Sequence, residues 1–232
     1  MWSSPRRAKA YILSFPFSSM FGEHELRTQF IKIADKKIHL LEDKGGIVRY
    51  RRDDFEVIIK NNGEKLKVLP APALGYGVKL LMIKFRDPLV IPPKDAVAGF
   101  VEAPIEVDVK IGDLTIDHFI LGKEKYALYG AIEAGVICRY QVSPFYTEEP
   151  ESIGVAKLIV SNPSSEWKPL ERVVVPIKGT SMYYENTKAY YPLLLVTLKN
   201  HSPEVNNTGR PPKEGLNAVG KGLSLPNFLM RW

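Results

Sequence analysis

Short segments in which apolar and polar residues alternate recur along the whole chain, and turn residues separate them. The clearest is residues 105–111 (IEVDVKI), where every second residue is apolar. A period of two places the apolar side chains on one face of a strand and the polar ones on the other. The 18 prolines and 17 glycines favour many turns and few long helices. We therefore expect an all-β fold with few or no long helices.

The spacing of these segments predicts antiparallel sheets. In residues 22–93 the segments are short and regularly spaced, which is typical of an antiparallel meander. Asn62–Gly63 is the strongest hairpin signal in the chain, because both residues tolerate a positive φ. Longer strands with turns between them in residues 94–200 predict an antiparallel β-sandwich, which makes the second half immunoglobulin-like.

Four regions follow from these patterns. Residues 1–21 form an N-terminal arm, 22–93 the meander, 94–200 the sandwich and 201–232 an extended tail, with Pro92–Pro93 at the boundary between the two β regions. The tail is polar at first and ends in an apolar peptide, LSLPNFLMRW. This peptide docks either on its own domain or on a partner. We favour its own domain, because Phe228 and Trp232 would be costly to leave in water.

Residues 123–150 hold two short apolar runs joined by a connection between Gly130 and Gly135, which predicts a hairpin. Arg139 lies in the second run, with Tyr126, Tyr129, Tyr140 and Tyr146 close by in sequence. One interpretation is a cationic and aromatic binding surface. The alternative, which we favour, is an arginine stacked on tyrosines that stiffens a sheet.

A second tyrosine-rich segment covers residues 179–191 and includes Tyr183 and Tyr184. Tyrosine and arginine contribute more than other residue types to interface energetics. We therefore expect the binding residues to include those of both segments and of the terminal peptide: Arg139, Tyr129, Tyr146, Tyr183, Tyr184, Phe228 and Trp232.

No motif indicates catalysis. The single cysteine, Cys138, falls on an apolar face without a histidine nearby in sequence, so we expect a buried thiol. The four histidines have no metal-site spacing, and the Gly-x-Ser-x-Gly nucleophile motif is absent. We expect no enzyme activity, metal or cofactor. One alternative is a hydrolase that uses carboxylates from distant strands.

Charge and hydropathy bear on partners and location. The net charge of +6 favours acidic partners such as nucleic acid, although lysine and arginine are spread along the chain. No apolar run is long enough to span a membrane. Residues 1–17 weakly resemble a signal peptide, but Ser14 and Pro16 interrupt the apolar run. We therefore expect a cytoplasmic protein without a membrane partner.

Several short motifs resemble an archaeal family of uncharacterised proteins, domain of unknown function 432. They are KYALYG, GVICRY and YTE between residues 125 and 148, LVIPP at 89–93 and the closing FLMRW. The resemblance covers most of the chain. It implies an archaeal source and a mostly β fold, and it implies no catalytic residue, cofactor or partner.

The leading functional hypothesis is a non-catalytic β protein that binds another macromolecule, either a protein or a ribonucleoprotein. It depends on the tyrosine-rich segments and the apolar terminal peptide. The alternative is a basic accessory protein that binds nucleic acid, with bases stacked on exposed tyrosines beside a basic track. Nothing in the sequence indicates an oligomeric state.

Overall fold

The computed structural model describes residues 20–199 and 202–230. In this part of the chain all regular structure is β-strand, arranged in four sheets. The all-β prediction is confirmed. None of the described residues forms a helix that could cross a membrane. The expected arm at residues 1–19 and the residue Trp232 lie outside the described residues.

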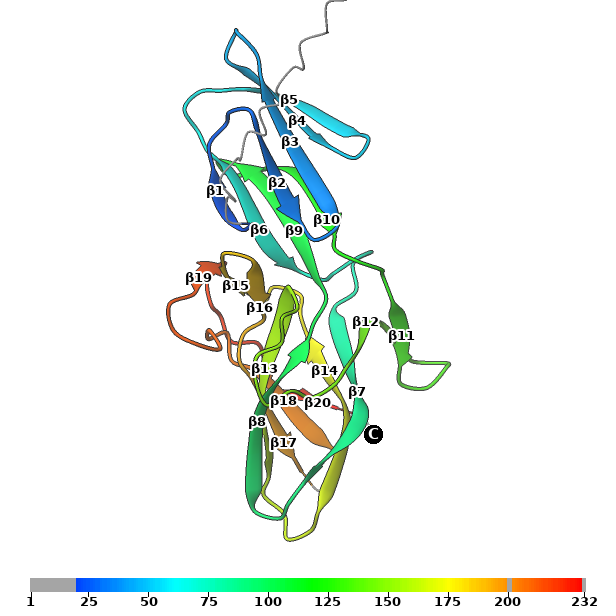
Figure 1. Ribbon diagram of the computed structural model, residues 1–232. Coiled ribbons are helices and arrows are strands. Elements are labelled where there is room, and N and C mark those ends of the chain that lie inside the picture. Colours follow the sequence, from blue (N-terminus) through cyan, green and yellow to red (C-terminus); the bar gives the residue numbers. More distant parts are fainter. Residues whose placement is uncertain (1–19, 200–201, 231–232) are drawn as a thin grey trace, which may run out of the picture.

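The molecule is elongated and has an upper and a lower half, each with two sheets (Figure 1). In the upper half, one sheet has the order β1 (Gly22–His24), β6 (Leu66–Pro72), β9 (Ile105–Ile111), β10 (Leu114–Ile120). The other is a meander of β2 (Gln29–Ile33), β3 (Lys36–Glu42), β4 (Ile47–Arg52) and β5 (Phe55–Lys60). All pairs in both sheets are antiparallel, as the spacing of the segments predicts.

A buried carboxylate joins the two upper sheets. Asp117, on β10, accepts a hydrogen bond from the Tyr50 hydroxyl at 2.6 Å and forms an ion pair with Arg52 at 2.7 Å. The donors come from β4, so the bonds cross between the sheets. Since each carboxylate oxygen has a donor, burial of Asp117 is compensated.

The Asn62–Gly63 turn does not make a hairpin, because β5 and β6 lie in different sheets. The Asn61 side chain accepts a hydrogen bond from Gly63 N at 3.0 Å and donates one to Leu26 O at 3.0 Å. The turn therefore carries the chain from one upper sheet to the other.

The lower half also contains two sheets. One has the order β11 (Tyr126–Tyr129), β12 (Val136–Ser143), β7 (Leu80–Ile91), β14 (Lys168–Pro176). The other runs through β19 (Asn217–Val219), β15 (Met182–Glu185), β16 (Lys188–Tyr190), β13 (Gly154–Asn162), β17 (Leu194–Leu198), β18 (Pro203–Asn207) and β20 (Phe228–Leu229). In this second sheet β8 (Asp95–Glu102) also pairs with β13.

Antiparallel pairs are accompanied by parallel ones in the lower half. β12 lies parallel to β7, and β13 lies parallel to β16 and β17. Parallel neighbours need long connections. The chain provides one of these between β7 and β12, where it leaves the lower half and returns.

The chain crosses between the halves more than once. Residues 22–72 lie in the upper half, 80–102 in the lower, 105–120 in the upper and 126–230 in the lower. The boundary expected at Pro92–Pro93 falls in the connection between β7 and β8, inside the lower half. The pairing of β6 with β9 joins residues on the two sides of that boundary.

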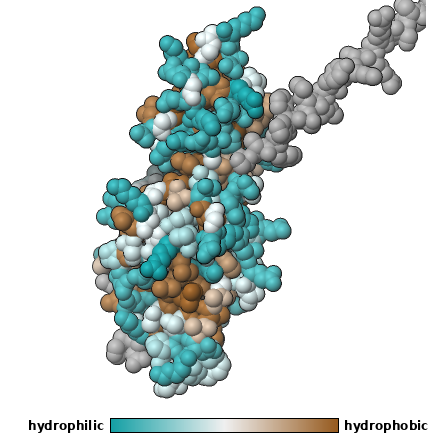
Figure 2. Space-filling model, turned by 90° about the vertical axis from the view of Figure 1, so that its left-hand side faces the viewer, coloured by the Kyte–Doolittle hydropathy of each residue, from teal (hydrophilic) through white to brown (hydrophobic). Residues whose placement is uncertain are grey.

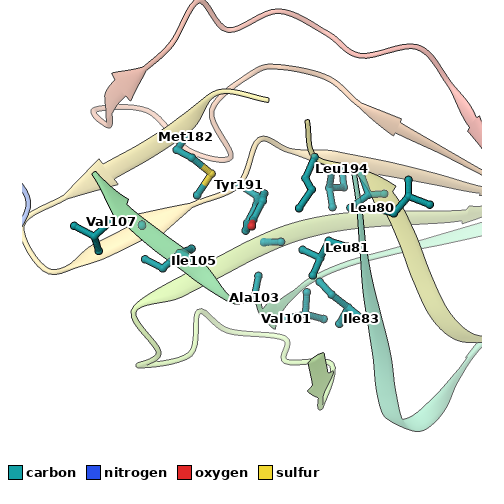
Figure 3. Packing of buried hydrophobic residues seen from close by; sticks show 14 of the residues in the cluster. Leu80, Leu81, Ile83, Val101, Ala103, Ile105, Val107, Met182, Tyr191 and Leu194 are labelled. Atoms are coloured by element: carbon teal, nitrogen blue, oxygen red, sulfur yellow. The ribbon is translucent and has the colours of Figure 1, made fainter. Parts of the chain in front are cut away.

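One hydrophobic core runs through both halves (Figure 3). Tyr191, just after β16, lies between Val107 of the upper half and Leu194 of the lower half. Its hydroxyl accepts a hydrogen bond from Ala73 N at 3.0 Å and donates one to Pro104 O at 2.8 Å. Ala73 and Pro104 belong to two of the crossings, so this side chain connects both to the lower half.

The described part of the tail packs on its own chain, which is the alternative favoured above. β18 pairs with β17, β19 with β15 and β20 with β18. Met230 is buried, and its Sδ accepts a hydrogen bond from Val174 N at 3.1 Å. Residues 203–230 therefore complete the second lower sheet and do not form a free linker.

Candidate functional site

The hairpin expected in residues 123–150 is formed by β11 and β12. Gly130 has a φ of 107°, which a residue with a side chain rarely adopts. A Cβ at Gly135 would lie 2.6 Å from Leu128 Cδ1. The two glycines therefore let the connection turn closely, and the hairpin projects from the body of the lower half (Figure 1).

Arg139 does not lie on the surface, so it is not the exposed contact residue considered above. β12 is a central strand, since Arg139 faces Tyr126 of β11 on one side and Leu81 of β7 on the other. Its side chain is fully buried. Arg139 Nη1 forms an ion pair with Glu124 Oε1 at 3.1 Å, and the guanidinium carbon lies 5.3 Å from the centre of the Tyr126 ring. The favoured interpretation, an arginine stacked on tyrosine, describes this geometry.

Two Arg139 nitrogens, Nε and Nη2, have no hydrogen-bond partner among the described residues. A buried donor without a partner costs free energy, because its bonds to water are lost. Glu124 therefore compensates only part of the cost of burying the guanidinium. Its Oε1 also accepts a hydrogen bond from the Tyr126 hydroxyl at 2.6 Å.

A second polar group lies on β9 and β10 of the upper half. Glu106 is buried, and its Oε1 accepts a hydrogen bond from Gly75 N at 2.7 Å. His118 Nε2 lies 3.1 Å from Glu106 Oε2, and His118 Nδ1 lies 2.7 Å from Asp108 Oδ1. Hydrogen bonds to Asp108 and Glu106 raise the pKa of His118 to about 10. The imidazolium is therefore held between two carboxylates at neutral pH.

Gly75 connects these two groups. Its φ is 48°, and a Cβ there would lie 2.2 Å from the Tyr126 hydroxyl. We call the whole set the junction cluster: Asp108, Glu106, His118, Tyr126, Glu124 and Arg139. The bonds form two groups, one of Asp108, Glu106 and His118 in the upper half and one of Tyr126, Glu124 and Arg139 at the hairpin. Gly75, which bonds to Glu106 and lies close to Tyr126, is the contact between the two groups.

The remaining predicted tyrosines do not form an exposed surface. Tyr183 is buried, and its hydroxyl donates to Gly209 O. Tyr184 lies edge-on to Phe21, with ring centres 6.1 Å apart. The prediction that these tyrosines form a binding surface was therefore wrong. The sequence shows that the tyrosines are clustered, but it does not show that the tail and Phe21 pack against them.

The other predicted residues also contact their own chain. Tyr129 is buried, and its ring centre lies 6.1 Å from that of Phe228, which is partly buried. The partly exposed Tyr146 donates from its hydroxyl to Glu102 Oε1 at 3.1 Å. The structure therefore brings Tyr129 together with Phe228 and separates both from Arg139.

Cys138 is buried as expected. Burial raises the pKa of its thiol to about 11. A nucleophilic cysteine needs the opposite shift, because the thiolate is the reactive form. Among the described residues, no group of three histidine, cysteine, aspartate or glutamate side chains is placed to hold a metal ion.

Sequence reasoning missed an exposed apolar surface at the hairpin end. Its side chains are Leu128, Ile132, Val136 and Ile137, which are 42%, 87%, 48% and 52% exposed; Val136 lies on the opposite face of the hairpin from Leu128 and Ile137. Leu128 faces Ile137 directly across the two strands. The signal was present, because Val136 and Ile137 are adjacent on one strand and cannot both face the same core.

A second apolar region is less exposed. The register places Ala98, Ile159 and Leu195 in one row across β8, β13 and β17, and Leu195 is 38% exposed. Figure 2 shows apolar side chains gathered over the lower half, while the upper half is mostly hydrophilic. Leu195 is less exposed than any of the four hairpin residues, so the projecting hairpin end is the stronger candidate.

The chain was compared with known proteins. The model of one family, Protein of unknown function (DUF432), matches residues 20–231. Searches of curated proteins and of solved structures found no match. The family match spans all of the described residues, including both halves and the hairpin. The chain therefore belongs to the DUF432 family, whose function is unknown.

Proposed function

We propose that this protein is a non-catalytic, cytoplasmic module that binds another protein through the apolar end of the β11–β12 hairpin. The observation that carries the proposal is the exposure of Leu128, Ile132, Val136 and Ile137 on a projecting hairpin. Apolar side chains gathered at an exposed site favour association, because water is released when they are covered.

The edge of β11 supports an extended partner segment. Among the described strands, β11 pairs only with β12. The Lys125 carbonyl accepts a hydrogen bond from Tyr140 N at 2.8 Å. Backbone groups alternate in direction along an antiparallel strand, so those of Tyr126 and Leu128 point away from β12. A partner strand added to this edge would bond to them.

The junction cluster supports a binding role over catalysis. Asp108 and Glu106 are engaged by His118, and Glu124 is engaged by Arg139 and Tyr126. The bonds of Glu124 join β11 to β12, and the pairing of β12 with β7 attaches the hairpin to the lower half. A rigid binding element loses less conformational entropy when its partner associates.

The test is affinity capture from the source organism with three forms of the full chain. The wild type is compared with Leu128→Ser/Ile137→Ser and with a matched control, Leu114→Ser/Leu223→Ser. The control residues are also exposed, at 68% and 62%, but lie away from the hairpin. We expect the same protein to be captured by the wild type and the control, and at least about tenfold less by the hairpin variant.

Equal capture by all three forms would contradict the proposal. Substrate turnover that the wild type shows and the hairpin variant keeps would contradict the proposal that the protein is not an enzyme. Far-UV circular dichroism of the two variants checks that each keeps its β structure. Nuclease treatment before capture separates a direct protein partner from one bridged by nucleic acid.

A further inference from the structure

The meander β2–β5 has one buried and one outward face. Alternation puts Ile31, Ile38, Leu40, Val48 and Tyr50 in the core. The outward strand residues are Phe30, Lys32, Lys37, His39, Leu41, Ile47, Arg49, Arg51, Glu56, Ile58 and Lys60. Lysine and arginine supply five of these side chains, and Glu56 is the one carboxylate. The outward face is therefore strongly basic.

Much of this positive charge is not balanced within the described residues. Arg49 forms an ion pair with Glu56 at 3.4 Å. Lys32, Lys37 and Arg51 form none with any described carboxylate; Arg51 Nε instead lies 3.4 Å from the Asp53 carbonyl oxygen. Lys60 forms none with a described carboxylate either, so all five cations of this sheet face except Arg49 are available to an anionic partner.

Flat side chains lie in the middle of these cations. Phe30, His39 and Arg51 occupy one row across β2, β3 and β4. The Phe30 and His39 ring centres are 4.7 Å apart, and Phe30 is 51% exposed. Aromatic rings and guanidinium planes are the groups on which unpaired bases stack.

The two ends of the sheet differ in charge. At one end a surface hollow is lined by Asp35 and Asp53 as well as by Lys37, His39 and Arg51. The carboxylates there would repel phosphates. At the other end Lys60 faces Ile47. Lys37 and Arg51 line the same hollow, and Asp53 is already paired with Lys36 and Arg52, so a polyanion is favoured from these two cations toward Lys60, past Asp35.

We propose that this outward face binds single-stranded nucleic acid. Lys32, Lys37, Arg51 and Lys60 contact phosphates, and bases stack on Phe30 and His39. An acidic protein segment would also match the charge, but it would gain less from the exposed ring, so nucleic acid is favoured. This surface is separate from the β11–β12 hairpin, and the proposal does not depend on the proposed protein partner.

The test uses fluorescence anisotropy of labelled oligo-dT and oligo-rU, about 16 nucleotides long. The full chain is titrated at salt concentrations from about 50 to 200 mM. We expect both probes to bind, with a slope of log K against log salt of about −2 to −3, which corresponds to three or four phosphates at about −0.7 each. A difference between the probes assigns DNA or RNA as the better ligand.

Two variants separate phosphate contact from stacking. Lys37→Gln/Arg51→Gln should make the salt slope shallower by about 1.4. Its control, Lys178→Gln/Lys221→Gln, removes the same charge from exposed positions in the lower half and should change the slope little. Phe30→Ala should weaken binding about tenfold with the slope unchanged. Its control is Trp167→Ala, another exposed aromatic residue.

Three results would overturn the proposal. The first is no binding of either probe at about 50 mM salt. The second is a loss of affinity and of salt slope in Lys178→Gln/Lys221→Gln as large as that in Lys37→Gln/Arg51→Gln. The third is that polyglutamate displaces the labelled probes as well as unlabelled oligonucleotide does, while Phe30→Ala has no effect on binding. This result would assign the face to an acidic protein. The replaced side chains are exposed, and thermal melts confirm that each variant folds.

Discussion

His118 gives the clearest test at the scale of single residues. Its pKa is raised above the ordinary value of 6.5, to about 10, by hydrogen bonds to Asp108 and then Glu106. The stability that the imidazolium contributes is therefore fully present below about pH 6.5 and is lost as the pH rises through about 10. We expect an NMR titration of this ring to have its midpoint near pH 10 in the folded protein.

The variant Asp108→Asn removes the largest cause of the shift and should lower the midpoint by about 1 to 3 pH units. The same ring in urea-unfolded protein serves as the control and should titrate near pH 6.5. A midpoint near 6.5 in the folded wild type would contradict the bridged geometry.

The sequence predicts which side chains share a face of a strand, but it does not predict which distant residues cover that face. The alternation in residues 105–111 correctly puts Val107 and Val109 in the core, and it predicts a solvated Glu106. Glu106 is buried because Gly75 and His118, distant in sequence, bond to it. The side chain of Arg139 is likewise contacted by Glu124 and by the ring of Tyr126, which its own strand does not contain.

At the scale of elements, β20 shows how the tail is held. Phe228 packs near Tyr129, Leu229 points outward, and Met230 is buried beside Val174. We expect Met230→Ala to lower the free energy of unfolding by about 3 kcal/mol, because a buried side chain is lost and a cavity remains. Urea unfolding with linear extrapolation measures this change.

The matched control is Leu229→Ala, since Leu229 is adjacent and exposed. Its effect should stay within about 0.5 kcal/mol. If both variants lower the free energy of unfolding equally, or if neither lowers it, burial of Met230 does not hold the tail in place.

Long alternating elements were predictable and short ones were not. The strands of the meander follow from apolar spacing and from the turn at Asp53–Asp54. The tail strands β19 and β20 have three and two residues, too few to show a period. They form because the neighbouring strands β15 and β18 offer backbone partners.

For the molecule as a whole, the sequence did not predict which strands pair with one another. Alternation states which face of β9 is apolar, but not that β9 pairs with β6 instead of with later strands. The crossings between halves and the parallel pairs in the lower half depend on contacts between distant residues. For this reason all-β could be predicted, while the interleaving of the two halves could not.

Tyr191 carries the last prediction, which concerns how the halves are joined. Its buried hydroxyl is bonded to Ala73 N and Pro104 O in two different crossings. Tyr191→Phe keeps the ring but leaves a buried donor, Ala73 N, and a partly buried acceptor, Pro104 O, without this partner. We expect it to cost about 3 kcal/mol of unfolding free energy. Tyr184→Phe is the control, because that ring is partly exposed, and its effect should stay within about 0.5 kcal/mol.

Hydrogen exchange shows whether this bond pair couples the halves. Amides of β4 report on the upper half and amides of β13 on the lower half. In the wild type the two sets should share one opening free energy, since one core runs through both halves. In Tyr191→Phe the β4 amides should exchange faster than those of β13, because the lower half retains more of its own sheet contacts. Separate opening free energies in the wild type would mean that the halves are independent domains and that Tyr191 only packs between them.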